Sequence, residues 1–278
     1  MSGPPTHLQE DSDGDRSPGL PPGRTVHETR DGGPAEPLLW ISDDPPAAGL
    51  WGALHAVHGQ TGRWPLILGS SPYSPGSPWT TGDLDRSLVE TGPGDHDAAA
   101  LLAGWWVTYA TAEEDEDAIT ASEQVDVTAP FGDRWPGLAP PGTPQEDPAV
   151  RAGEFADHLV ADSWLTAPRL GLCVSARGAD AAADLGWGGA LNYDNDTAKF
   201  STVLRSWEGR FGARVVGIGP AELYLSVAAP PTDPDHALLV AAEHFAFCPD
   251  NVWQSDLNTL VRYAGSITDR AWWSFWWD

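Results

Sequence analysis

The C-terminal part of the chain has the most regular pattern of apolar and polar positions. Apolar residues three or four apart predict amphipathic helices, and short runs rich in branched and aromatic residues predict strands. These patterns place strands at residues 169–174, 215–218, 223–228 and 272–277, and helices at residues 178–185, 197–211, 234–247 and 257–267. Asp196 and Asp233 precede two of the helices as N-caps, and Gly212 follows one of them. We therefore predict one α/β unit over this part of the chain.

The last of these strands is unusually aromatic. Side chains alternate between the two faces of a strand, and this alternation yields two sets, namely Trp272, Ser274 and Trp276 on one face and Trp273, Phe275 and Trp277 on the other. Both sets are mostly apolar. We therefore predict that this strand is docked in the sheet with both faces covered, in an interior or well-shielded position.

The first half of the chain has a weaker pattern. Residues 38–41 and 63–68 read as strands on either side of a short helix, which predicts a parallel pair with a crossover. Further helices are expected at residues 95–109 and 148–164, with loops rich in proline, glycine or acidic residues between them. The fold class is thus α/β (α+β), a mixed sheet flanked by helices. Three segments are predicted: a disordered tail at 1–36, an α/β region at 37–147 and a C-terminal α/β domain at 148–278.

Composition restricts the class of partner. The chain has 40 acidic and 15 basic residues, a net charge of −25, and the excess of acid lies mainly before residue 148. A charge of this sign repels nucleic-acid backbones and anionic lipid, so we expect no nucleic acid and no membrane as partner. A basic protein is the partner that such a surface favours. The 15 tryptophans lie mostly in periodic apolar stripes, so core packing accounts for them better than a stacking platform does.

The cysteines and the N-terminal residues indicate a compartment. Cys173 and Cys248 are the only two cysteines, and residues 1–30 lack the basic stretch and apolar run of a secretory signal. We therefore expect a cytoplasmic protein with reduced thiols. No apolar run approaches the roughly 20 residues that cross a bilayer. No motif for a cofactor is present, and we expect none.

One group of residues has the chemistry of a catalytic site. Glu243, His244, Cys248 and Asp250 follow one another closely, and a thiol beside an imidazole and a carboxylate can act as a nucleophile with its base. However, Cys248 continues the buried stripe of its predicted helix, which favours a core role. His244 and Cys248 are four residues apart, as in a helical metal pair, but without further ligands we expect no metal site. The nucleophile remains the alternative.

A second group lies in the loop at residues 186–196. Its side chains with binding potential are Trp187, Asn192, Tyr193, Asp194 and Asn195. Glycine-containing loops often carry ligand-binding groups, and this loop lacks the pattern of a phosphate or dinucleotide site. A turn that orders its own backbone through Asn and Asp side chains is the simpler interpretation, and recognition of a ligand or protein is the other.

Four motifs in the C-terminal unit form a recognisable set. They are LGWGGALNY at 185–193, VLRSWEGRFGA at 203–213, AAEHFAFCPDN at 241–251 and WSFWWD at 273–278. Together they resemble the bacterial family called domain of unknown function 4253, which is frequent in actinobacteria, over about residues 169–278. The resemblance implies an α/β fold and carries no established activity, so it transfers no catalytic residue.

These observations lead to a functional hypothesis with one rival. We expect a non-catalytic protein-binding module, of a regulatory or immunity-like kind, whose acidic surface and aromatic loop contact a basic protein. The rival is a hydrolase or transferase that uses the cluster of His244, Cys248 and Asp250, or else Asn192 and Tyr193, in a cleft beside the sheet.

Overall fold

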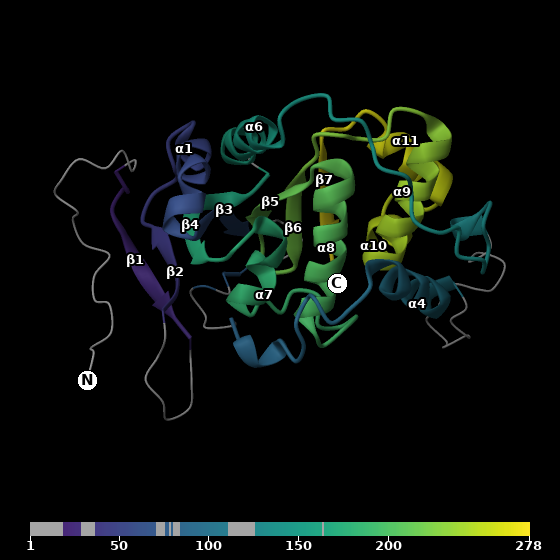
Figure 1. Cartoon of the computed structure of the whole chain (residues 1–278), viewed down its shortest axis with the longest axis horizontal. Helices are drawn as coiled ribbons and strands as arrows, with labels where there is room; N and C mark the ends of the chain where they lie inside the picture. The colour runs from purple at the N-terminus through teal and green to yellow at the C-terminus, as the bar shows by residue number, and fades with distance from the viewer. Residues whose placement is uncertain are drawn as a thin grey trace.

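A seven-stranded mixed sheet forms the centre of the molecule (Figure 1). The computed structural model describes residues 19–28, 37–70, 76–77, 79, 84–110, 126–162 and 164–278. The strands are β1 (Gly23–His27), β2 (Pro37–Ser42), β3 (Arg63–Ser70), β4 (Thr166–Val174), β5 (Arg214–Ile218), β6 (Glu222–Ser226) and β7 (Trp272–Trp276). Their order in the sheet is β1-β2-β4-β3-β5-β6-β7, and all neighbours are antiparallel except β3 and β5.

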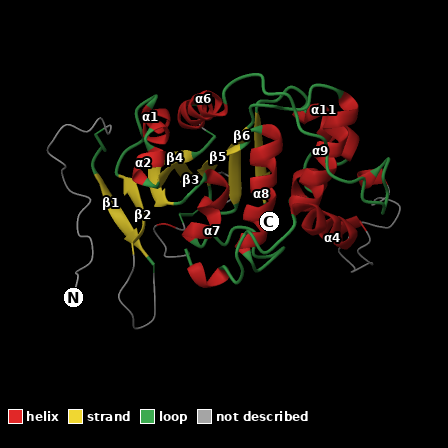
Figure 2. Cartoon of the chain, in the orientation of Figure 1, coloured by secondary structure: helices red, strands yellow, loops and turns green. Residues whose placement is uncertain are grey.

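Helices cover both faces of the sheet (Figure 2). They are α1 (Leu50–Ala56), α2 (His58–Thr61), α4 (Ala98–Ala110), α6 (Pro148–Ala161), α7 (Ala181–Leu185), α8 (Thr197–Phe211), α9 (Pro234–Phe247), α10 (Asp250–Trp253) and α11 (Leu260–Ile267), with single turns of 3-10 helix at η1 (Arg86–Leu88) and η2 (Gly178–Asp180). Helices α1 and α6 lie on one face, and α8 and α9 lie on the other (Figure 1).

Aromatic side chains fill the space between the sheet and helices α8 and α9. Trp207 of α8 contacts the rings of Trp273 and Phe275 of β7, with ring centroids 5.5 and 5.3 Å apart. Phe247 of α9 packs on Phe275 at 5.0 Å. On the opposite face, Trp272 stacks on Phe155 of α6 at 6.0 Å. The aromatic strand therefore contributes to the packing on both faces.

The predicted mixed sheet with flanking helices is confirmed, and so are the local signals that set the helix ends. The Asp196 side chain accepts a hydrogen bond from Ala198 N at the start of α8, and Gly212 ends this helix with a φ of 60°. The Asp233 side chain accepts from His236 N at the start of α9. These caps act within a few residues of the chain, which is why the sequence pattern could locate them.

The predicted parallel pair is wrong as a pair of neighbours. β2 and β3 do point the same way, but β4 lies between them and is antiparallel to both. Thus Trp64 of β3 pairs with Cys173 of β4, which comes more than a hundred residues later. A local reading of strand, helix and strand could not detect a strand inserted from so far along the chain.

Two further differences concern the edges of the sheet. β7 is an edge strand and not an interior one, and its two faces are unequal, since Trp273, Phe275 and Trp277 are buried whereas Trp272, Ser274 and Trp276 are partly exposed. At the other edge, Gly23–His27 forms β1 inside the segment predicted as a disordered tail, and it pairs with β2.

Both predicted α/β segments contribute to this one sheet. β2 and β3 come from the region before residue 148, and β4 to β7 come after it. The β3–β5 pairing joins the two sets directly. The division into a region at 37–147 and a domain at 148–278 remains a prediction about folding units. One of the loops expected from the sequence, the acidic run at residues 113–117, lies outside the described residues.

Candidate functional site

The Cys248 thiol lies at the C-terminal end of α9 and is fully buried. Its Sγ donates a hydrogen bond to the main-chain oxygen of Trp276 in β7 at 2.9 Å. Burial, and to a smaller extent the charge of Asp250, raise the pKa of the thiol well above its usual value. A thiol that stays protonated is a poor nucleophile. In this position Cys248 holds the end of the last strand.

His244 lies one turn before Cys248 and is also fully buried. Its Nδ1 is 3.1 Å from the hydroxyl oxygen of Tyr263 in α11, and the ring packs against Trp273 at 4.4 Å. Burial, together with the positive charge of Arg210, lowers its pKa to about 3. The imidazole is therefore neutral at physiological pH, and no hydrogen bond joins it to the Cys248 thiol among the described residues.

Glu243 faces a different part of the interior. Its two carboxylate oxygens accept from the Arg210 guanidinium at 2.7 and 2.6 Å, and also from Trp207 Nε1 and Ala139 N, both at 2.7 Å. Arg210 in turn donates to the Ala139 main-chain oxygen at 2.9 Å. This buried ion pair fixes the segment before α6 to helices α8 and α9. All the strong hydrogen-bonding positions of the carboxylate are in use.

Asp250 and Asn251 complete the contacts between α10 and β7. Asp250 Oδ2 accepts from the Tyr193 hydroxyl at 2.6 Å and from Asp278 N at 3.0 Å. Asn251 Nδ2 donates to the Ser274 main-chain oxygen at 2.7 Å, and Asn251 Oδ1 accepts from Trp276 N at 3.2 Å. The carboxamide thus replaces a neighbouring peptide group at the open edge of β7. We call Cys248, Asp250 and Asn251 the β7 lock.

The predicted binding loop, residues 186–196, contacts α10 and the residues that follow β7. Trp187 is fully buried, and its Nε1 donates to Gly219 O at 2.8 Å. Asn192 Nδ2 donates to Asp278 O at 2.8 Å, and Asp194 forms an ion pair with Lys199 at 2.8 Å. Two members, Asn192 and Asn195, are exposed. The structure therefore brings the loop together with Asp250 through Tyr193, and the aromatic ring of Trp187 belongs to the core.

A cleft of about 660 Å³ lies between β7, α10 and α11. Trp272 and Trp276 of β7 are half-buried in its wall, and the lock residue Asn251 and Tyr263 line it as well. Burial raises the Tyr263 pKa. The Asn251 amide donates to the Tyr263 hydroxyl at 3.1 Å. The main contacts of both side chains are therefore with the protein itself.

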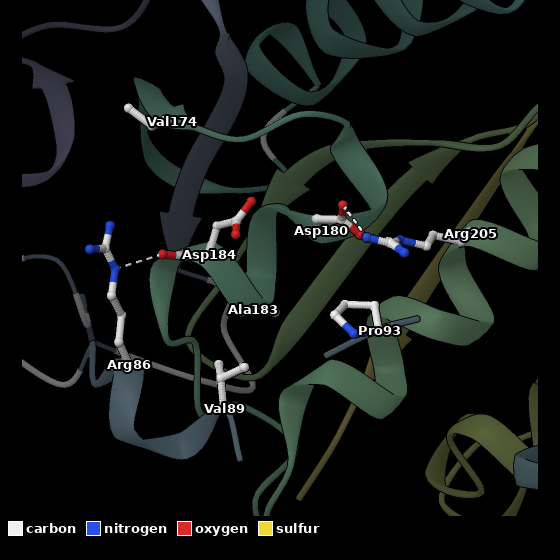
Figure 3. Close-up of a pocket in the computed structure, with 8 residues that line it drawn as sticks. All are labelled: Arg86, Val89, Pro93, Val174, Asp180, Ala183, Asp184 and Arg205. Atoms are coloured by element: carbon white, nitrogen blue, oxygen red, sulfur yellow. Dashed lines mark hydrogen bonds and ion pairs between the residues drawn. The ribbon is translucent and has the colours of Figure 1, made fainter. Parts of the chain in front are cut away.

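A second cavity, of about 490 Å³, lies at the end of β4 (Figure 3). Its lining residues come from four parts of the chain: Arg86, Val89 and Pro93 near η1, Val174 of β4, Asp180, Ala183 and Asp184 of η2 and α7, and Arg205 of α8. η1 lies close to the end of α7, because the Gly186 main-chain oxygen accepts a hydrogen bond from Asp85 N at 2.8 Å. A Cβ at residue 186 would clash with Asp85, so glycine is required for this approach. No sequence pattern predicts this cavity, because its charged residues share no motif.

The acidic groups of this cavity have different surroundings. Asp180 receives two hydrogen bonds from the Arg205 guanidinium, at 2.6 and 2.8 Å. The Arg86 Nε instead reaches the main-chain oxygen of Asp184, at 3.0 Å (Figure 3). Burial raises the pKa of the Asp184 carboxyl. Among the described residues, no ion pair within 4.0 Å includes the Asp184 carboxylate.

The described residues contain neither a metal-binding cluster nor a membrane-spanning helix. No group of three or more His, Cys, Asp or Glu side chains is placed to hold a metal ion in the part of the chain that the structure describes. Within the same residues, every helix is too short or too polar to span a bilayer.

Comparison with known proteins agrees with the resemblance found in the four motifs. Residues 169–278 match the model of the family described as Domain of unknown function (DUF4253). No curated protein and no solved structure matches the chain. The matched region contains the β7 lock, the loop at 186–196 and the carboxylates Asp180 and Asp184.

Proposed function

We propose that the protein is a non-catalytic binding protein whose partner is a basic protein. The proposal rests on one observation: every reactive side chain of the cluster at residues 243–250 is buried and contacts other parts of the fold. The Cys248 thiol and Asp250 hold β7, Glu243 is saturated by Arg210 and its neighbours, and His244 is neutral and buried. Catalytic groups need access to a substrate and a suitable protonation state. All four side chains are buried, and burial also keeps the Cys248 thiol protonated and the His244 imidazole neutral.

The charge of the chain supports the second part of the proposal. A net charge of −25 produces a field that attracts basic proteins and speeds their encounter at low salt. The exposed loop residues Asn192 and Asn195 supply polar contacts beside the C-terminal strand. A regulatory or inhibitory role, in which the chain covers a basic enzyme or toxin, fits these properties.

The proposal is tested by capture followed by measurement on purified proteins. The full chain is immobilised, lysate from its own host cells is applied, and the captured protein is purified and titrated by calorimetry. We expect a basic partner whose Kd increases at least tenfold between about 50 mM and about 500 mM salt. Cys248→Ala serves as a control and retains the binding.

Two results would contradict the proposal. One is a Kd that does not respond to salt, because charge would then contribute little to the contact. The other is an enzymatic turnover by this chain that Cys248→Ala or His244→Gln abolishes while the variant stays folded by circular dichroism. The second result would instead favour the hydrolase or transferase hypothesis.

A further inference from the structure

We infer that the cavity at the end of β4 accepts a lysine or arginine side chain of the partner, with Asp184 as its counter-ion. This inference rests on the proposed function, because it names the part of a basic partner that the chain contacts. The cavity has the two features that such a side chain requires, an apolar wall for its methylene groups and a carboxylate for its charged end.

The apolar wall is formed by Val89, Pro93, Val174 and Ala183. Val174 has an exposed fraction of 68%, the highest among the large apolar side chains that the structure describes. It lies at the end of β4, where the strand runs out of the sheet. An aliphatic stem that packs on Val174 would remove this surface from water, which favours binding.

The carboxylate of Asp184 forms no ion pair within 4.0 Å among the described residues, although the more distant charges of Arg86 and Arg205 act to lower its pKa. Arg205 is engaged by Asp180, and Arg177 also approaches Asp180, at 4.0 Å. Arg86 contacts the main-chain oxygen of Asp184, and its own main-chain nitrogen donates to Glu28. Arg86 and Arg205 therefore lie in the wall of the cavity and Arg177 lies near it, but none of the three forms an ion pair within 4.0 Å with the Asp184 carboxylate.

The hydrogen bond from Ser175 does not fully offset the cost of burying the charged Asp184 carboxylate. The Ser175 hydroxyl favours the charged form of this carboxylate, but it donates to Arg177 O at 2.8 Å. A hydroxyl has one proton, so it cannot serve both acceptors at once. Burial and the nearby Asp180 both oppose ionisation of Asp184. An ammonium or guanidinium group from outside would offset both effects.

Titration of Asp184 gives the binding a characteristic pH dependence. The charged groups that face it are Asp180 from η2, Arg205 from α8 and Arg86 from η1, and the Cys173 thiol of β4 lies behind it. The pKa of Cys173 is raised to about 12, so this thiol stays neutral. A bound cation stabilises the ionised form of Asp184, so the affinity increases as the pH rises through the raised pKa of this carboxyl.

The test uses a doubly blocked lysine, Nα-acetyl-lysine methylamide, as the probe. It is titrated into the full chain and followed by amide NMR, with the isosteric blocked norleucine as the uncharged control. We expect saturable shifts at Val174, Ala183 and Asp184 with the lysine probe and none with norleucine. The affinity should increase from pH 4 to pH 7.

Variants separate this site from general attraction to an acidic surface. Asp184→Asn should weaken the lysine probe at least tenfold and remove its pH dependence, whereas Asp256→Asn, at an exposed position in the other cleft, should change the affinity less than twofold. Val174→Lys places a cation at the mouth of the cavity from an exposed site. This variant should also lower the affinity for the probe, so it tests the site even if Asp184→Asn fails to fold.

Three outcomes would overturn the inference: no saturable shift at these residues, equal binding of lysine and norleucine, or equal binding by wild type and Asp184→Asn. These outcomes leave the proposed function standing if capture of a basic partner remains sensitive to salt. Conversely, if the lysine probe bound but no salt-sensitive partner were found, the binding site in the cavity would be supported and the proposed function would be wrong.

Discussion

Replacement of Asn251 by alanine should destabilise the protein by about 3 kcal/mol. The change removes three strong hydrogen bonds, those to Ser274 O at 2.7 Å and Tyr263 Oη at 3.1 Å and the one from Trp276 N at 3.2 Å, together with a weaker one from Cys248 Sγ at 3.5 Å. Each such bond contributes about 1 kcal/mol net. The cleft beside β7 lets water reach part of the freed edge, so the full penalty for buried unsatisfied groups does not apply.

Urea unfolding, followed by tryptophan fluorescence and by circular dichroism, measures this change. With a slope of about 3 kcal/mol per molar urea, a loss of 3 kcal/mol lowers the unfolding midpoint by about 1 M. The two signals must coincide for the free energy to be meaningful, since a chain of 278 residues can populate intermediates. Hydrogen exchange at the Trp276 amide should accelerate in the same variant.

Asn195→Ala is the matched control. Asn195 is exposed in the loop at 186–196, and its side chain makes no hydrogen bond with the described residues. Its replacement should change the unfolding free energy by less than about 0.5 kcal/mol. If Asn251→Ala and Asn195→Ala had the same midpoint, the carboxamide would not be holding the edge of β7, and the assignment of the β7 lock would be wrong.

Three further predictions concern the buried charged and reactive groups. Glu243→Gln leaves Arg210 without its counter-ion and should cost about 3 kcal/mol in urea unfolding, and a variant within 0.5 kcal/mol of wild type would contradict the role of this pair. Cys173 and Cys248 should resist iodoacetamide at pH 8 in the native protein and react in urea, which mass spectrometry would detect; rapid native labelling of Cys248 would refute its burial. Because the pKa of His244 is lower in the folded than in the unfolded state, its contribution to the free energy of unfolding is fully present above about pH 6.5. This contribution decreases by up to about 1.4 kcal/mol per pH unit as the pH falls toward 3. His244→Leu should flatten this dependence.

Much of the fold was predictable from the sequence because its signals are local. The caps at Asp196 and Asp233 and the stop at Gly212 act on residues three or four positions away, and the helices that they delimit match the predicted ones closely. Strand order depends instead on contacts such as Trp64 with Cys173, which no local pattern encodes. The same limit explains why β1 was missed, since its partner β2 supplies most of the apolar surface of the pair.

The candidate site was less predictable, for a related reason. The sequence singles out Cys248 and Asp250 by their chemistry, but the groups that they contact lie in Trp276 and Asp278, more than 25 residues later. Asn251 is part of the family motif, and its role becomes visible only when the free edge of β7 is placed beside it. No sequence pattern singles out Asp184, because the arginines around it come from distant parts of the chain.

The position of β7 gives a physical reason for the residues of the lock. An edge strand exposes main-chain donors and acceptors that attract other chains, and proteins commonly cover such an edge. Here the carboxamide of Asn251 occupies one donor and one acceptor, the Cys248 thiol supplies a small donor for a further carbonyl, and Asp250 receives the amide of Asp278. Each of these contacts requires a polar group close to the edge of the strand. Residues that resemble a nucleophile and its orienting carboxylate therefore have structural contacts at the edge of the sheet.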